Sequence, residues 1–64
     1  MNLDVQKLKI EVCKHGMNQK ELVEKSGVSK ATISKIYNGG SCSTETAKKI
    51  VSVLGLELRN MVKE

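Results

Sequence analysis

The side chains best suited to chemistry lie between residues 30 and 37, in the stretch KATISKIY. On a helix that turns by about 100° per residue, Ile33 and Ile36 share one side. The opposite arc holds five small, polar or basic residues: Lys30, Ala31, Thr32, Ser34 and Lys35. No acidic residue occurs from position 25 to position 44. Such a face could approach a polyanion, although a lysine- and serine-rich face that only meets solvent is the simpler interpretation.

A helix of this kind fits the major groove of double-stranded DNA, which is about 12 Å wide and bordered by phosphates. In the groove, Lys30 or Lys35 could donate hydrogen bonds to the O6 and N7 atoms of guanine. The methyl groups of Ala31 and Thr32 could contact the methyl group of thymine. Either lysine could instead bind a phosphate without reading sequence, so the residues alone leave both roles open.

Length and charge are consistent with such a partner without identifying it. The 64 residues predict one domain with a small core, and 11 Lys and Arg against 7 Asp and Glu give a net charge of +4. Nothing in the sequence resembles a signal peptide or a membrane-spanning segment. Two cysteines, at positions 13 and 42, are too few for a disulfide framework. We therefore expect a cytoplasmic protein with reduced thiols and no membrane partner.

Hydrophobic spacing predicts helices along the whole chain and hence an all-α fold. The first predicted helix covers residues 3–14 and ends before Gly16. Asn18 and Glu21 have the spacing of a capping box, which predicts a second helix that ends at Gly27. Ser29 is the expected cap of the helix over residues 30–37.

Two more helical segments are predicted after the glycines at positions 39 and 40. Ser43 or Thr44 caps a fourth helix whose inner face carries apolar residues, namely Ala47, Ile50, Val51 and Leu54. Gly55 ends that helix, and a fifth segment over residues 56–62 is apolar enough to pack on the core or on another chain.

The order of these pieces resembles the lambda-repressor-like, or XRE, helix-turn-helix family. The similar stretches are MNQKELVEKSGVS, TISKIYNG and STETAKKIVSVLGLEL. The resemblance implies a compact five-helix domain over residues 1–64, with its helix-turn-helix at about residues 19–37. Two departures stand out: Val23 replaces an alanine common in the family, and Val12 and Tyr37 replace an arginine and glutamate that often form an ion pair.

The resemblance also implies roles for individual residues. Gln19 and Asn38 match residues that bind DNA phosphates, and Asn18 could add to that contact. Residues 30, 31, 32, 34 and 35 match positions from which family members reach base edges. We expect Tyr37 to pack on Val12 with its hydroxyl at the surface, where it could also touch a phosphate.

The function that the resemblance favours is a sequence-specific DNA-binding transcriptional regulator, of the repressor type, from a bacterium, phage or mobile element and associated with the nucleoid. A homodimer is expected because one such domain reads only a few base pairs. Its interface would be the C-terminal segment: Leu56, Leu58, Met61 and Val62. The alternative is a protein-binding module, an antirepressor or antitoxin, that acts through the same segment.

Other kinds of chemistry have little support in the sequence. Catalysis would need a nucleophile with a nearby base or paired carboxylates, and no such constellation is recognisable. Cys13, His15 and Cys42 are the only soft metal-ligand candidates, whereas a structural zinc site normally has four ligands. We therefore predict no enzymatic activity, metal, cofactor or small-molecule ligand. Cys13 is expected in the core, Cys42 in a loop and His15 on the surface at a helix end.

Overall fold

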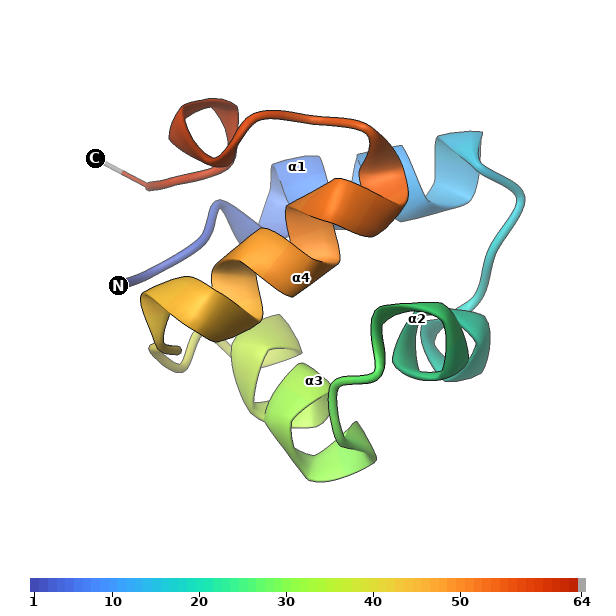
Figure 1. Cartoon of the computed structure of the whole chain (residues 1–64), viewed down its shortest axis with the longest axis horizontal. Coiled ribbons are helices and arrows are strands. Elements are labelled where there is room, and N and C mark those ends of the chain that lie inside the picture. Colours follow the sequence, from blue (N-terminus) through green and yellow to red (C-terminus); the bar gives the residue numbers. More distant parts are fainter. Residues whose placement is uncertain (64) are drawn as a thin grey trace.

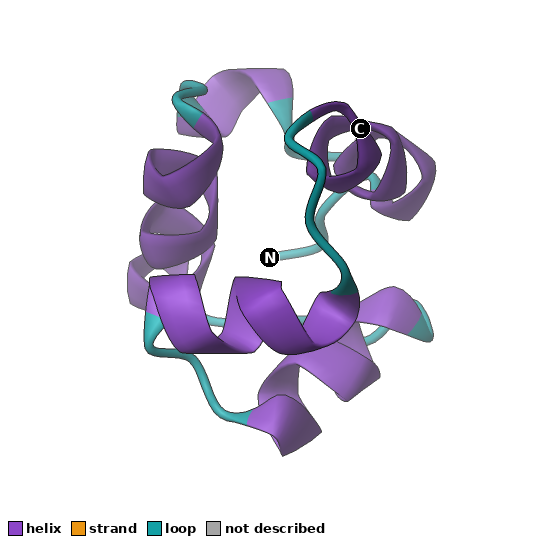
Figure 2. Cartoon of the chain, turned by 90° about the vertical axis from the view of Figure 1, so that its right-hand side faces the viewer, coloured by secondary structure: helices purple, strands orange, loops and turns teal. Residues whose placement is uncertain are grey.

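The computed structural model describes residues 1–63 and is built from helices joined by short loops (Figures 1 and 2). The elements in chain order are α1 (Val5–Lys14), α2 (Gln19–Ser26), α3 (Lys30–Tyr37), α4 (Thr44–Leu54) and the 3-10 turn η1 (Leu58–Asn60). Helix α4 packs against α2, and α3 lies beside both at one edge of the molecule (Figure 1). The predicted all-α fold is confirmed in its first four helices.

Local side-chain caps determine where the four α-helices begin. In each case a side-chain oxygen of the residue before the helix accepts a hydrogen bond from a backbone N–H three residues on; these residues are Asp4, Asn18, Ser29 and Ser43. The capping box of Asn18 and Glu21 is present in full. The predicted start at Leu3 is wrong, because Asp4 caps the first helix and leaves Leu3 in an extended segment.

The core is a single cluster of apolar side chains drawn from all four helices and from both ends of the described chain. Leu8, Leu22, Ile33, Ile36 and Ile50 are almost fully buried at its centre. No buried polar side-chain atom of residues 1–63 lacks a hydrogen-bond partner. Within these residues, no helix has the length and apolar character needed to cross a membrane.

The fifth α-helix is not formed, and the segment that should contain it is a single 3-10 turn. The reason is a long-range backbone pairing. Leu3 and Val62 form an antiparallel bridge, flanked by the hydrogen bonds Asp4 N–H to Met61 O (2.7 Å) and Lys63 N–H to Asn2 O (2.9 Å). Residues 61–63 therefore use their backbone groups to hold the extended segment before α1 and cannot continue a helix.

Two predicted side-chain locations are also wrong. Met61 is completely buried in the core, so it cannot belong to the expected interface with another chain. Leu56 and Leu58 are half-buried and pack against the same core. Cys13 is exposed rather than internal, because it lies on the side of α1 opposite the buried Leu8 and Val12.

Replacing Met61 with alanine tests its place in the core. Removing a fully buried methionine side chain should lower the free energy of unfolding by about 2–5 kcal/mol, a large share of the stability of so small a domain. Urea denaturation followed by circular dichroism would measure the loss, with the half-buried neighbour Val62→Ala as a control. Unchanged monomer stability combined with altered self-association would show that Met61 is an interface residue instead.

Candidate nucleic-acid interface

The turn between α2 and α3 is built by three consecutive residues. Gly27 ends α2 in the left-handed region at φ +72°, and its N–H donates to Val23 O at 3.0 Å. Val28 is buried in the core, and Ser29 then caps α3. These three residues change the chain direction within one short connection and fix how α3 is presented.

Burial divides α3 into an inner and an outer face. Ile33 and Ile36 point into the core, while Lys30, Ala31 and Lys35 are exposed. Ser34 and Thr32 have intermediate exposure, and the Thr32 hydroxyl oxygen accepts a hydrogen bond from Ser29 Oγ at 2.9 Å. The predicted outward arc is confirmed, with Thr32 at its margin and partly engaged in the helix cap.

The start of α2 and the start of α3 border one open hollow of about 390 Å³. Gln19, Lys20, Val23 and Lys30 line it. Val23 is half-buried here, where many family members have alanine, and its side chain forms an apolar wall between two lysines. The sequence patterns did not single out Lys20, whose proximity to Lys30 depends on how α2 crosses α3.

Asn18, just before this hollow, is exposed, but some of its hydrogen-bonding groups are already used within the protein. Its side-chain oxygen accepts from the Glu21 N–H at 2.8 Å, and its own N–H donates to Glu21 Oε1 at 3.3 Å. The oxygen of Asn18 is thus committed to the helix cap, which leaves its amide NH₂ group as the hydrogen-bonding group available to a partner.

At the other end of α3, Tyr37 takes the place of the ion-paired glutamate found in many family members. Its ring is half-buried against the core, and the Lys9 Nζ lies 5.7 Å from the ring centroid. A cation–π contact between α1 and α3 therefore occupies the position of the missing ion pair. Burial raises the pKa of Tyr37 above its ordinary value of 10.0.

Asn38 and Gly40 shape the exit from α3. Asn38 is exposed and ends the helix, with its N–H shared between Ser34 O (3.1 Å) and Lys35 O (3.2 Å). Gly40 passes so close to Lys35 that a β-carbon there would lie 2.5 Å from Lys35 Cγ and 2.8 Å from Lys35 O. Only glycine fits this approach, which packs the chain against the Lys35 stem.

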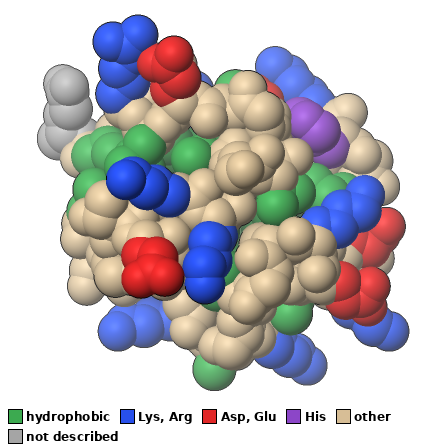
Figure 3. Space-filling view, in the orientation of Figure 1, with side chains coloured by type: hydrophobic (Ala, Val, Ile, Leu, Met, Phe, Trp, Pro, Cys, Tyr) green, Lys and Arg blue, Asp and Glu red, His purple; other side chains and the backbone are tan. Residues whose placement is uncertain are grey.

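The lysines around α3 are not neutralised by carboxylates. Among residues 1–63 the ion pairs are Lys14–Glu11 (3.3 Å), Lys49–Glu45 (4.0 Å) and Arg59–Glu57 (2.6 Å). None of them includes Lys20, Lys30 or Lys35. The side of the molecule with α4 in front, by contrast, shows acidic and basic side chains interspersed (Figure 3).

A comparison with known protein families decides what this arrangement represents. A family model described as helix-turn-helix matches residues 8–60, which include all of α2, α3 and α4. The chain belongs to the lambda-repressor-like helix-turn-helix family. No curated protein and no solved structure gives a match. The helix-turn-helix family is a DNA-binding family and not an enzymatic one.

The matched region contains both α2 and α3, which are joined by the short turn at residues 27–29. The fold places the predicted residues in two groups. Gln19 and Lys30 meet at one hollow, with Asn18 beside it, whereas Tyr37 and Asn38 lie at the far end of α3. Lys9 and Lys20 adjoin these groups but were not predicted, because their neighbours come from other helices.

Tyr37 is the chain's single tyrosine, which makes its ionisation directly observable. Phenolate absorbance should titrate with a midpoint above 10.0 in the folded protein and at a lower pH in denaturant. Because the unfolded chain loses this proton first, stability should fall as pH rises from about 10 towards the folded-state pKa. Comparing wild type with Tyr37→Phe isolates the effect from lysine titration, and identical midpoints in folded and denatured protein would contradict it.

Proposed function

We propose that the protein is a sequence-specific transcriptional regulator that inserts α3 into the major groove of double-stranded DNA. The observation that carries the proposal is the outer face of α3, which is exposed, basic and free of carboxylates while Ile33 and Ile36 anchor its inner face. Base edges are read from this face by some of five residues: Lys30, Ala31, Thr32, Ser34 and Lys35. Lys30, Ala31 and Lys35 are the most exposed of them.

Phosphate contacts at both ends of α3 orient it in the groove. Gln19, at the N-terminus of α2, meets one phosphate through its side chain and the helix N-terminus, and the amide of Asn18 adds a donor. Asn38 and the Tyr37 hydroxyl serve the other end. Contacts of this kind set the position and register of the domain without reading sequence.

Repression follows from occupancy: a protein bound at an operator excludes polymerase from the same DNA. Two copies bind half-sites about one DNA turn apart, because a single recognition helix covers too few base pairs. The exposed parts of Leu56, Leu58 and Val62 supply the surface between the two copies, without the buried Met61. Because Leu56 and Leu58 already pack in part on the core, this surface is small, and the dimer forms mainly on DNA.

Selection of bound duplexes from a random pool tests this function. Enrichment of an inverted repeat with half-site centres about one DNA turn apart is the expected result. Failure to enrich any sequence, together with capture of a protein partner through the segment 56–62, would favour the protein-binding alternative.

Replacing Lys35 with alanine should weaken binding to the selected duplex by about 1–3 kcal/mol if Lys35 reads a base, and leave the melting temperature nearly unchanged. Fluorescence anisotropy and thermal denaturation measure the two effects. Lys48→Ala on α4 is the matched control, since Lys48 is exposed on another helix and belongs to none of the ion pairs among residues 1–63. A large loss of stability at unchanged affinity would mean that the faces of α3 have been assigned the wrong way round.

Replacing Gln19 with alanine should weaken binding by a similar factor for the selected duplex and for unrelated duplexes, because a phosphate contact reads no sequence. Parallel titrations of wild type and Gln19→Ala with both kinds of duplex give the comparison. A change in the preferred sequence would show that Gln19 takes part in base reading.

A further inference from the structure

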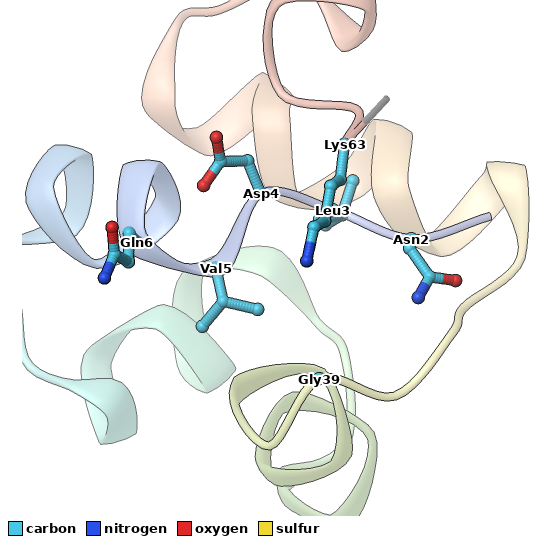
Figure 4. Close-up of a pocket in the computed structure, with 7 residues that line it drawn as sticks. All are labelled: Asn2, Leu3, Asp4, Val5, Gln6, Gly39 and Lys63. Atoms are coloured by element: carbon cyan, nitrogen blue, oxygen red, sulfur yellow. The ribbon is translucent and has the colours of Figure 1, made fainter.

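A second hollow, of about 320 Å³, lies where the extended segment before α1 passes the C-terminal end of α3 (Figure 4). Its lining comes from three separate parts of the chain: residues 2–6, Gly39 and Lys63. Gly39 directly follows Asn38, so this hollow borders the end of the recognition helix. It belongs to neither the turn between α2 and α3 nor the hollow at Gln19.

Backbone hydrogen bonds hold the walls of this hollow in place. Asn2 O accepts from the Lys63 N–H at 2.9 Å, which ties the two segments together at the level of the hollow. One residue earlier, Met1 O accepts from the Cys42 N–H at 2.8 Å and joins the same segment to the loop after α3. The side chains of Asn2 and Lys63 therefore project from a frame that is fixed relative to α3.

The groups that line the hollow are suited to an anion. Lys63 contributes an ammonium group that extends towards Gly39 (Figure 4). Asn2 and Gln6 carry amide NH₂ donors at opposite ends of the lining, and Lys63 lies between them (Figure 4). Lys63 takes part in none of the ion pairs among residues 1–63. The one carboxylate of the lining, on Asp4, caps α1 through the Lys7 N–H at 3.1 Å and is directed away from Gly39 (Figure 4).

The hollow also adjoins a cation supplied by α1. Gln6 lies one helical turn before Lys9, and the Lys9 Nζ stands over the ring of Tyr37, the last residue of α3. Lys9 therefore places a second cation near the end of α3.

We propose that this hollow binds a backbone phosphate of duplex DNA, with Lys63 supplying the charge and the Asn2 amide supplying a hydrogen bond. The proposal rests on the proposed function, since the phosphate belongs to the duplex whose groove holds α3. It adds a contact made by the two segments that flank the helical domain, beyond those of α2 and α3.

The salt dependence of binding tests the proposal. Lys63→Gln keeps a flexible polar side chain and the backbone bond to Asn2 but removes the charge. The slope of log K against log salt should become shallower by about 0.9, the value for one lost phosphate contact. Lys48→Gln on α4 changes the net charge equally and should leave the slope unchanged, since Lys48 is exposed and belongs to none of the ion pairs among residues 1–63.

A second variant raises binding instead of lowering it. Asp4→Asn preserves the helix cap, because asparagine and aspartate cap equally well, and removes the only carboxylate of the hollow. Affinity for duplex should rise at an unchanged melting temperature, and by more than in the control Glu45→Gln on α4.

Equal slopes for Lys63→Gln and Lys48→Gln, in a protein whose wild type binds duplex, would overturn the phosphate site alone. Absence of salt-dependent duplex binding by the wild type would overturn the proposed function and this site with it. The two failures are therefore distinguishable in one set of titrations.

Discussion

The burial of Ile33 and Ile36 is the interaction on which the rest of the structure depends. An isolated helix of eight residues is marginal in water, and α3 contains serine, threonine and isoleucine, which are mediocre helix formers. Its stability therefore comes from the core, where both isoleucines are almost fully buried against residues of α2 and α4. Because the inner face supplies the stability, the outer face is free to remain small and basic.

The two ends of α3 are also fixed by contacts outside its outer face. Gly27 and Ser29 set its start, whereas Tyr37, under the Lys9 ammonium, and the close approach of Gly40 to Lys35 set its exit. Beyond that exit, the segments around Met1 and Lys63 are tied by backbone hydrogen bonds to each other and to Cys42. The short helix α3 is in this way held in place at both of its ends.

Features encoded by neighbouring residues could be predicted from the sequence, and features that depend on distant ones could not. The starts of α2 and α3 could be predicted because the caps at Asn18 and Ser29 are hydrogen bonds between residues only three positions apart. The two faces of α3 follow from the periodicity of its apolar residues. The pairing of Leu3 with Val62 joins residues 59 positions apart, and it replaced the expected fifth helix. Lys9 and Lys20 could not be predicted for the same reason. Lys9 is notable only because it lies over Tyr37, and Lys20 only because it lines the same hollow as Lys30.

The most direct test of the central claim, that the outer face of α3 is the DNA-binding surface, is an amide NMR titration of the isotope-labelled protein with duplex DNA. The largest shift changes should fall on residues 30–38 and on Gln19. Changes concentrated in residues 56–62, with those of α3 unmoved, would contradict it and would place the working surface at the C-terminal segment.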